Sequence, residues 1–192
     1  TRRTSELAID VFADIGYANA STKQIAAFAG VAEGNIFAKF KNKQGLLDAL
    51  LQPVMTAIAP AAFQHFVATN FTQEYPTLAA FIDPMVHERL AFLQAHPKLL
   101  KILFSELAYS QSRREQLALA LPTTQRAVIH AEFANLQARH LLVDWPDADI
   151  LRVLWSLLGG TATMFLFYGT PPDADQLTVA MCKVLRPETS AQ

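Results

Sequence analysis

The stretch Thr22–Lys41 reads TKQIAAFAGVAEGNIFAKFK and decides the fold. Its two apolar-patterned halves are separated by a single glycine, Gly30, which follows Ala26 by four positions. Two short helices can cross at a steep angle through a tight turn only if the residues at the crossing are small. Val31 and Ile36 then supply apolar anchors for the second helix. This spacing predicts a helix-turn-helix, whose second helix can lie in the major groove of DNA.

Start and stop signals around this stretch predict short helices. Ser21 and Gln24 form the sequence pattern of a capping box, which places the start of a helix at Thr22. A preceding helix is expected from residue 2 to residue 15, ended by Gly16. The second helix of the motif is expected from Glu33 to about residue 39. A fourth helix begins near residue 43, and Pro53 should kink or split it because proline lacks a backbone donor.

The rest of the chain keeps a helical apolar period, and no segment alternates with the period of a strand. Further helices are expected near 74–95, 98–110, 123–142, 148–168 and 174–185. The predicted fold is therefore all-α: an N-terminal three-helix helix-turn-helix domain joined by a long helix to a C-terminal helical domain. Glycines crowd the first 45 residues and are sparse afterwards. This change predicts a DNA-binding domain at 1–47 and a ligand-binding and dimerisation domain at 48–192.

Bulk composition limits the cellular setting but does not itself point to nucleic acid. The 192 residues are 52% hydrophobic and carry a formal net charge of −1. Within the first 50 residues, six basic side chains face five acidic ones, and three lysines alternate over 39–43. A local stripe of this kind can bind phosphate on a neutral protein. The single cysteine, Cys182, excludes an intrachain disulfide and suits a reducing cytoplasm, and no signal peptide is visible.

The longest uncharged run, Val153–Pro172, is about long enough to cross a bilayer. It contains Gly159, Gly160 and two prolines at its end, and no basic residue flanks its C-terminal side. A buried or subunit-interface helix is the better interpretation, so no membrane partner is expected.

The N-terminal motifs resemble the DNA-binding domain of the TetR (tetracycline repressor-like) family over about residues 3–50. The residues that carry the resemblance are Gly16-Tyr17, Ser21-Thr22, Ile25-Ala26, Gly30-Val31, the run Gly34–Phe40 and Lys43 followed by Leu46-Leu47. The remaining three quarters of the chain resembles the family only in size and helical character. The resemblance implies a repressor that binds a palindromic operator in double-stranded DNA as a homodimer.

The resemblance implies phosphate contacts for Thr22, Lys39 and Lys43. The family usually has tyrosine where this chain has Phe37, and a phenyl ring cannot donate a hydrogen bond to a phosphate. It often has histidine where this chain has Lys39, and lysine keeps the phosphate role with a full charge. These departures leave open how strongly the protein binds the phosphate backbone of DNA.

The same resemblance places base-reading residues at the start of the second helix of the motif. Glu33 and Asn35 occupy positions that face base edges, with Lys23 nearby. Asparagine can pair with adenine through two hydrogen bonds, and glutamate can accept one from cytosine. Gly34 would let the protein backbone approach DNA closely. Glu33 stands where the family is frequently basic, which lowers the expected non-specific affinity and leaves the operator sequence open.

The family's C-terminal domain binds a small effector, so a cavity for an apolar molecule is expected there. The side chains expected to line it are Phe66, Met85, Arg89, Phe104, His130, Phe133 and Met164. For any one of the aromatic and methionine residues, simple core packing is the better explanation, and a surface position is an alternative for Arg89 and His130. The resemblance also implies that the helices near 123–142 and 148–168 pair with their copies in a second subunit.

Enzymatic functions are disfavoured by missing motifs. His87-Glu88 begins like a zinc-protease helix, but the second histidine of that motif would fall at Ala91. No glycine-rich phosphate loop and no Gly-x-Ser-x-Gly elbow occur, so no enzyme, metal or cofactor is expected. Two alternatives stay open: a helical ligand-binding protein or enzyme without a DNA role, and a DNA-binding repressor without a small-molecule effector.

Overall fold

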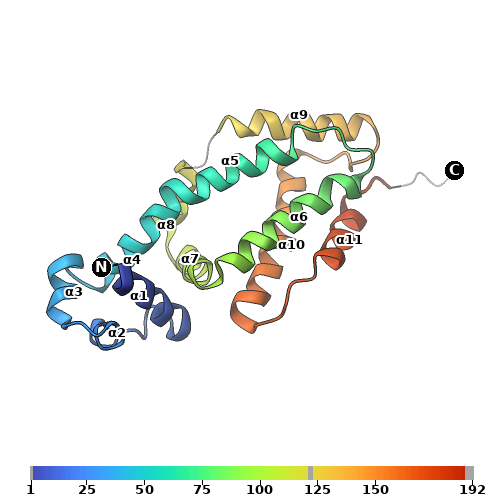
Figure 1. Cartoon of the computed structure of the whole chain (residues 1–192). Coiled ribbons are helices and arrows are strands. Elements are labelled where there is room, and N and C mark those ends of the chain that lie inside the picture. Colours follow the sequence, from blue (N-terminus) through green and yellow to red (C-terminus); the bar gives the residue numbers. More distant parts are fainter. Residues whose placement is uncertain (1, 121–122, 189–192) are drawn as a thin grey trace. The chain divides into compact units, whose positions relative to one another are not determined.

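The computed structural model describes residues 2–120 and 123–188. These residues fold into helices and loops without any strand, which confirms the predicted all-α class (Figure 1). They form two compact units. The first unit contains residues up to 61 together with 96–120, and the second contains residues 62–95 together with the described residues from 123 onward.

The first unit begins with the helix-turn-helix. Its helices are α1 (Arg2–Ile15), α2 (Thr22–Ala29) and α3 (Glu33–Phe40). Ser21 and Gln24 form the predicted capping box at the start of α2, and Gly30 ends this helix in a left-handed conformation with φ of 62°. Both α2 and α4 pack on α1, and α3 packs on α2. The shared core is closed by fully buried side chains, namely Ala8, Phe12, Ile25, Ile36, Leu46 and Leu47.

Three helical segments follow one another without a break after the motif: α4 (Lys43–Pro53), η1 (Val54–Ile58) and α5 (Ala59–Asn70). The prediction that Pro53 would disturb this helix is confirmed, because a π-helical stretch begins at the next residue. The backbone N–H of Ala59 donates to the carbonyl of Val54, five residues earlier. A proline removes one donor from the helical ladder, and a π-turn is a common way to accommodate the disturbance.

Gly45 lies in the first turn of α4, where the backbone of α3 comes close. A Cβ atom at this position would overlap the carbonyl oxygen of Phe40, so only glycine fits. The turn is held from the other side by Asn42, whose side-chain oxygen accepts a hydrogen bond of 2.7 Å from the Gly45 N–H. The last residue of α3 and the first turn of α4 are therefore in direct backbone contact.

The first unit is completed by α7 (Pro97–Tyr109) and α8 (Gln111–Ala120). Arg113 on α8 is largely buried and donates to Glu106 on α7 at 3.0 Å and to Asp48 on α4 at 2.7 Å. The sequence predicted α7 closely but missed α8, since neither proline nor glycine marks the break between them. The backbone breaks at Ser110, whose hydroxyl accepts from the N–H of Arg113.

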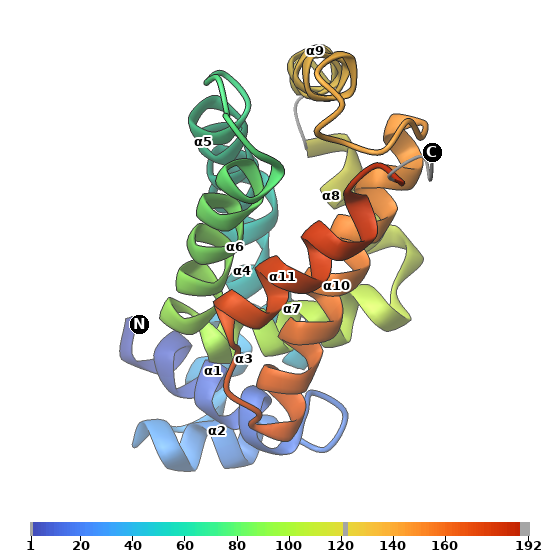
Figure 2. The ribbon, with the colours of Figure 1, turned by 90° about the vertical axis from the view of Figure 1, so that its right-hand side faces the viewer.

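The second unit contains most of α5 together with α6 (Leu78–Ala95), α9 (Gln125–Ala138), α10 (Asp147–Tyr168) and α11 (Ala174–Leu185). Both α10 and α11 pack on α6, and α10 packs on α11 (Figure 2). The predicted ranges are confirmed to within about four residues: α6 begins four residues later than predicted, and α9 ends four residues earlier. His140 takes a left-handed conformation with φ of 54° there. Histidine adopts this conformation more readily than most residues, but no glycine in the sequence marks the end of the helix.

Two helical stretches are long and apolar enough to cross a membrane by length and composition alone, Lys43–Asn70 and Asp147–Tyr168. In the second stretch, the buried side chains Ile150, Leu154, Ala162 and Leu166 recur at intervals typical of a helix packed along one face.

Candidate DNA interface and effector-binding unit

The helix α3 separates its side chains into a buried and an exposed face. Ile36 is 1% exposed and Phe40 is 9% exposed, so both pack against the core of the first unit. The predicted contact residues of α3 lie on the other face: Gly34, Asn35, Phe37 and Lys39 are exposed, and Glu33 is half-buried at the start of the helix. The helix thus presents its predicted DNA-reading residues to solvent.

Gly34 has open space around it, since a Cβ atom there would have no neighbour within 4 Å. Glycine is therefore not needed at this position to avoid a clash inside the chain. Its lack of a side chain instead leaves the helix backbone accessible to a partner from outside.

Thr22 and Glu33 contact each other directly. The hydroxyl of Thr22, at the start of α2, donates a hydrogen bond of 2.6 Å to Oε1 of Glu33, at the start of α3. The contact ties the N-terminal ends of the two helices together. It also uses the only hydroxyl proton of Thr22. The family resemblance predicts a phosphate contact for this residue. The sequence pattern could not reveal this pairing, because the two residues are eleven positions apart.

Lys43 holds the loop between α1 and α2. Its ammonium group donates to the carbonyl oxygens of Tyr17 at 2.8 Å, Ala18 at 3.3 Å and Ala20 at 2.9 Å. The same ammonium lies 4.4 Å from the centre of the Tyr17 ring. All three donors of the lysine are therefore used inside the protein. The phosphate contact expected for Lys43 stays a prediction, and it requires the ammonium to give up or share at least one of these carbonyls.

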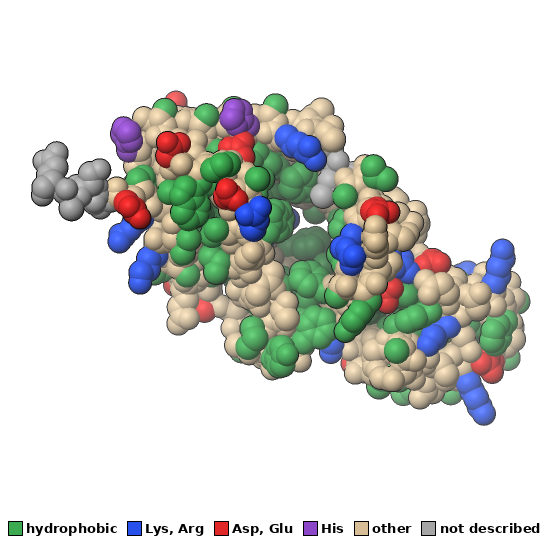
Figure 3. Space-filling model, turned by 180° about the vertical axis from the view of Figure 1, so that it is seen from behind, with side chains coloured by type: hydrophobic (Ala, Val, Ile, Leu, Met, Phe, Trp, Pro, Cys, Tyr) green, Lys and Arg blue, Asp and Glu red, His purple; other side chains and the backbone are tan. Residues whose placement is uncertain are grey.

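Lys23 and Lys39 are exposed, and Lys39 contacts the Phe40 ring with its ammonium 4.8 Å from the ring centre. Figure 3 shows Lys and Arg side chains standing out from the surface of the protein. One surface residue of α2 was missed by the sequence reasoning: Phe28 is 70% exposed. The local sequence does not distinguish burial from exposure for this side chain, because its neighbours Ala27 and Ala29 are both small and apolar.

Aromatic rings form the centre of the second unit. Phe71 contacts Phe66, Phe81 and Phe133 with ring centres 5.4 to 5.9 Å apart, and Tyr75 packs edge-on against Phe81 at 5.3 Å. All five side chains are at most 7% exposed. Two of the predicted effector contacts, Phe66 and Phe133, therefore belong to a mutually packed cluster, called here the aromatic core.

Arg89 lies beside this core and is part of a polar network. Its guanidinium stacks 4.3 Å above the Phe66 ring and donates to Glu88 at 2.6 Å. Glu88 also accepts from the side chain of Asn70 at 2.6 Å, and the Asn70 carbonyl accepts from the Tyr75 hydroxyl at 3.0 Å. The Nε atom of Arg89 is buried without a partner among the described residues. Arg89 thus keeps one donor unused beside an apolar surface.

The other predicted effector residues are dispersed. Met85 is buried in the second unit, whereas Phe104 is half-buried in the first unit. Met164 is 46% exposed and lines a groove of about 320 Å³ with Thr161, residues 170–173, Gln176 and Leu177. His130 is exposed on α9, and its Nδ1 lies 2.8 Å from a carboxylate oxygen of Asp147. Of the predicted effector residues, Phe66 and Phe133 belong to the aromatic core, and Arg89 lies against Phe66.

Glu132 on α9 is 6% exposed, and one of its carboxylate oxygens has no partner among the described residues. Burial raises the pKa of its carboxyl group, and the nearby carboxylate of Glu74 adds to the effect. The hydrogen bond from Asn135 and the charge of Arg139 act in the opposite direction but do not cancel the shift. The side chain lines an open groove of about 560 Å³ with Phe71, Glu74 and Val128.

The helix α10 exposes several large apolar side chains. Trp155 is 49% exposed, Met164 46%, Phe167 42% and Tyr168 73%. Figure 3 shows hydrophobic side chains at the protein surface among polar ones. Exposed apolar side chains of this size are available for contact with a partner protein.

The sequence and fold match those of known transcriptional regulators. Residues 6–50 match the bacterial regulatory proteins of the tetR family. The uncharacterized HTH-type transcriptional regulator YvkB of Bacillus subtilis is 46% identical over 50 residues, which cover 26% of this chain and 26% of that protein. The chain thus aligns with about a quarter of this curated relative.

Solved structures match over nearly the whole length. The fatty acid degradation regulator FadR from Bacillus halodurans has a TM-score of 0.64 at 17% identity, covering 100% of this chain and 96% of that chain. FadR from Bacillus subtilis in complex with stearoyl-CoA has a TM-score of 0.62 at 17% identity, covering 95% and 96%. A regulator from Saccharomonospora viridis in complex with choline has a TM-score of 0.64 at 19% identity, covering 95% and 93%.

At these identities the structural matches show the fold, and the family assignment comes from the N-terminal residues. The resemblance that the sequence motifs predicted is therefore confirmed. The helix-turn-helix region, residues 6–50, thus matches the tetR family of bacterial regulatory proteins, and the chain shares its fold with the FadR regulators.

Proposed function

We propose that the protein binds a palindromic operator as a homodimer and that a small apolar effector in the second unit controls this binding. The single observation that carries the DNA role is the exposed face of α3. Asn35 and Lys39 reach solvent there while Ile36 and Phe40 anchor the helix from behind. A helix held in this way can present the donors and acceptors of its first turns to base edges in the major groove.

The charges on this surface support weak binding to DNA of any sequence. The affinity should then depend strongly on the shape and sequence of the DNA. Lys23 and Lys39 are exposed on this surface, while Lys43 is used for internal hydrogen bonds. Glu33 adds a negative charge at the start of α3, where it repels nearby phosphates. The motif therefore binds non-specific DNA less tightly than a fully basic surface would, and specificity depends on contacts made by Asn35 and its neighbours.

A second subunit is supported by the large apolar side chains that α10 exposes. One helix-turn-helix contacts only a half-site, so tight binding requires two copies related by a two-fold axis. The apolar residues of α10 suit contact with the same helix of a second copy, since such an interface is self-complementary in a two-fold dimer. The predicted participation of α9 stays part of this proposal. A soluble cytoplasmic location follows from the same function.

An apolar effector is supported by the aromatic core and by Arg89. The unused Nε–H of Arg89 beside the Phe66 ring can donate to an anionic group attached to an apolar body. Two of the structurally similar regulators were solved with stearoyl-CoA and with choline, which are chemically very different. The features around Arg89 favour the first kind of molecule, an anion with an apolar chain.

The DNA role is tested by binding the purified protein to fragments from the region upstream of its own gene at two salt concentrations. We expect one short palindrome to be selected and its affinity to fall with salt. The Lys39→Ala variant should weaken binding and reduce the slope against salt by about one. The matched control is Lys183→Ala, which removes an exposed lysine from the second unit and should leave both quantities unchanged. Selection of no fragment would reject the DNA role.

The effector role is tested on the same complex by adding stearoyl-CoA, choline or coenzyme A alone. We expect stearoyl-CoA to change operator affinity in the wild type and to lose its effect in the Arg89→Met variant. If the operator binds equally with and without every compound tested, these compounds are not effectors. If choline acts and stearoyl-CoA does not, the role given to Arg89 is wrong.

A further inference from the structure

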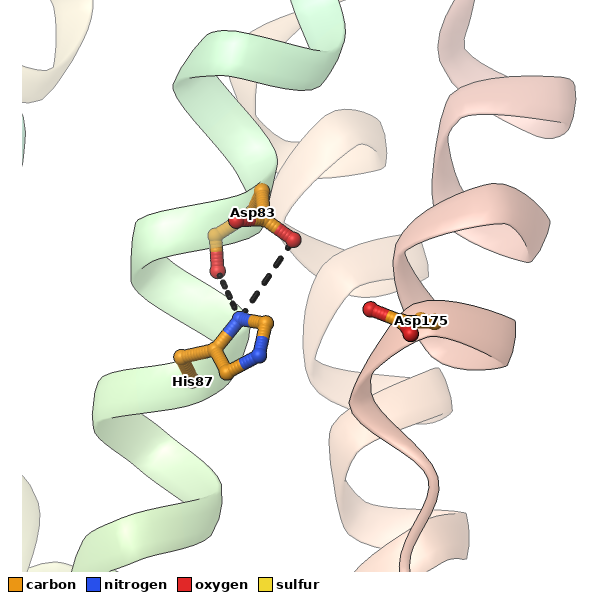
Figure 4. Close-up of side chains that lie close together, drawn as sticks. All are labelled: Asp83, His87 and Asp175. Carbon is orange, nitrogen blue, oxygen red and sulfur yellow. Dashed lines mark hydrogen bonds and ion pairs between the residues drawn. The ribbon is translucent and has the colours of Figure 1, made fainter.

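Three side chains that can bind a metal ion meet on the surface of the second unit. Asp83 and His87 lie one turn apart on α6, and Asp175 lies in the first turn of α11 (Figure 4). One potential ligand atom from each residue lies within 4.8 Å of those of the other two. The two helices pack along each other, so the three side chains are held on one surface by the core beneath them.

The imidazole of His87 is oriented by its own helix. Its Nδ1 lies 3.0 Å from the backbone carbonyl oxygen of Asp83 and 3.3 Å from that residue's carboxylate. A carbonyl oxygen can only accept, so Nδ1 carries the proton. In the neutral ring the free lone pair is then on Nε2. Figure 4 shows this second nitrogen on the side of the ring that faces α11 and Asp175.

The carboxylate of Asp83 is also held from α11. The hydroxyl of Thr178, which is 8% exposed, donates to Asp83 Oδ1 at 3.3 Å. Metal-binding histidines commonly donate their other N–H to a carbonyl oxygen, and metal-binding carboxylates are commonly hydrogen-bonded in turn. Both supporting contacts are present here, and they come from the two helices that supply the ligands.

We propose that Asp83, His87 and Asp175 form a binding site for a divalent transition-metal ion that links α6 to α11. One imidazole nitrogen and two carboxylate oxygens suit an ion of borderline softness such as Zn²⁺, rather than Ca²⁺ or Mg²⁺, which bind oxygen ligands almost entirely. Water completes a tetrahedral shell around Zn²⁺. The ligand atoms move toward one another by side-chain rotation when the ion enters, since zinc ligands lie about 2.0–2.2 Å from the metal.

The ion affects both charge and stability. Two carboxylates next to each other repel, and a divalent cation compensates that repulsion. An ion that binds the folded protein and bridges two helices raises the free energy of unfolding according to its concentration and affinity. The proposal concerns the second unit alone and does not depend on DNA binding or on an effector.

The experiment uses tag-free full-length protein dialysed against chelator. Titration calorimetry with Zn²⁺ alone should give one site per chain, with Mg²⁺ as the comparison ion. We expect His87→Ala and Asp175→Asn each to weaken Zn²⁺ binding at least tenfold. Thr178→Val, which keeps the shape of the buried side chain, should weaken it by about tenfold through loss of its support to Asp83. Zinc should also raise the melting temperature of the wild type but not that of His87→Ala.

The chain supplies a matched control on α9. His130 is exposed, and its Nδ1 also lies next to an aspartate, Asp147, at 2.8 Å, but this pair is not part of a three-residue group. His130→Ala should therefore leave zinc affinity unchanged. Circular dichroism of the metal-free variants checks that they remain folded. The proposal is overturned if wild type binds zinc no more tightly than His87→Ala, or if the site survives both His87→Ala and Asp175→Asn.

Discussion

The Thr22 hydroxyl and the Glu33 carboxylate are joined by a hydrogen bond of 2.6 Å that spans the two helices of the DNA-binding motif. On the proposed DNA interface, the pair places an acid near the phosphates and uses a hydroxyl that would otherwise donate to one. We therefore expect the pair to restrain general binding to DNA.

Replacing Glu33 by Gln should raise affinity for non-specific DNA several-fold at low salt, because a repulsive charge is removed and the Thr22 hydroxyl is bound less strongly. Fluorescence anisotropy with a random duplex measures this. Glu74→Gln, an exposed glutamate in the second unit, is the matched control and should have no effect. If Glu33→Gln binds random DNA as weakly as wild type does, the acid has no restraining role.

Lys39 and Lys43 are both expected to contact phosphates, but their replacement should affect the stability of the fold differently. Lys43→Met keeps the aliphatic stem but removes hydrogen bonds to three carbonyls, so it should lower the free energy of unfolding by about 1–2 kcal/mol. Lys39→Met should leave stability unchanged, since its ammonium is exposed. Urea denaturation followed by circular dichroism compares them. Equal stability of the two variants would show that the Lys43 contacts are weak in solution.

Phe133 is 0% exposed and lies in the aromatic core, so Phe133→Ala should cost about 3–5 kcal/mol of folding free energy. Chemical denaturation measures the loss. Phe37→Ala, on the exposed side of α3, should change stability by less than about 0.5 kcal/mol. A loss at position 133 close to that at position 37 would mean that the aromatic core is loosely packed.

The buried acid of α9 predicts a pH dependence. Because the pKa of Glu132 is raised above its ordinary value of 4.5, the folded state binds this proton more tightly than the unfolded state does. The contribution of Glu132 to stability is thus most favourable at low pH and falls as pH rises through the folded-state pKa. Glu132→Gln should therefore raise the melting temperature at pH 7, and the gain should shrink as pH approaches 4.5. A gain that is constant with pH would contradict a buried, titrating carboxyl group.

Trp155→Glu tests the proposed subunit interface. A charge in place of this exposed apolar side chain of α10 should convert a dimer to a monomer and weaken operator binding together with it. Sedimentation velocity gives the mass. Tyr109→Glu, at a side chain 93% exposed on α7, is the matched control and should stay dimeric. If the wild type sediments as a monomer, the proposed subunit interface is wrong.

Much of the helix-turn-helix was predictable because its signals are local. Ser21 with Gln24 marks a helix start, Gly30 marks a stop, and the period of Ile25, Ala29 and Ile36 identifies the inner face. Each signal depends on residues within one or two turns. The structure places all three where these rules expect them.

The sites were harder to predict because they depend on residues far apart in sequence. Nothing near Lys43 indicates that its ammonium reaches carbonyls 23 to 26 residues earlier. Nothing near His87 indicates that Asp175 lies beside it. The order of the helices could be predicted from periodicity, but which side chains meet across them depends on tertiary packing.

Gly45 links the recognition helix to the segment that follows it. Because no side chain fits between its Cα and the Phe40 carbonyl, there is no space there for the end of α3 to slide or tilt against the start of α4. We therefore expect α3 and α4 to move together at this point. A displacement of α4 should then change the angle at which α3 meets a DNA groove, while the exposed residues of α3 keep their spacing.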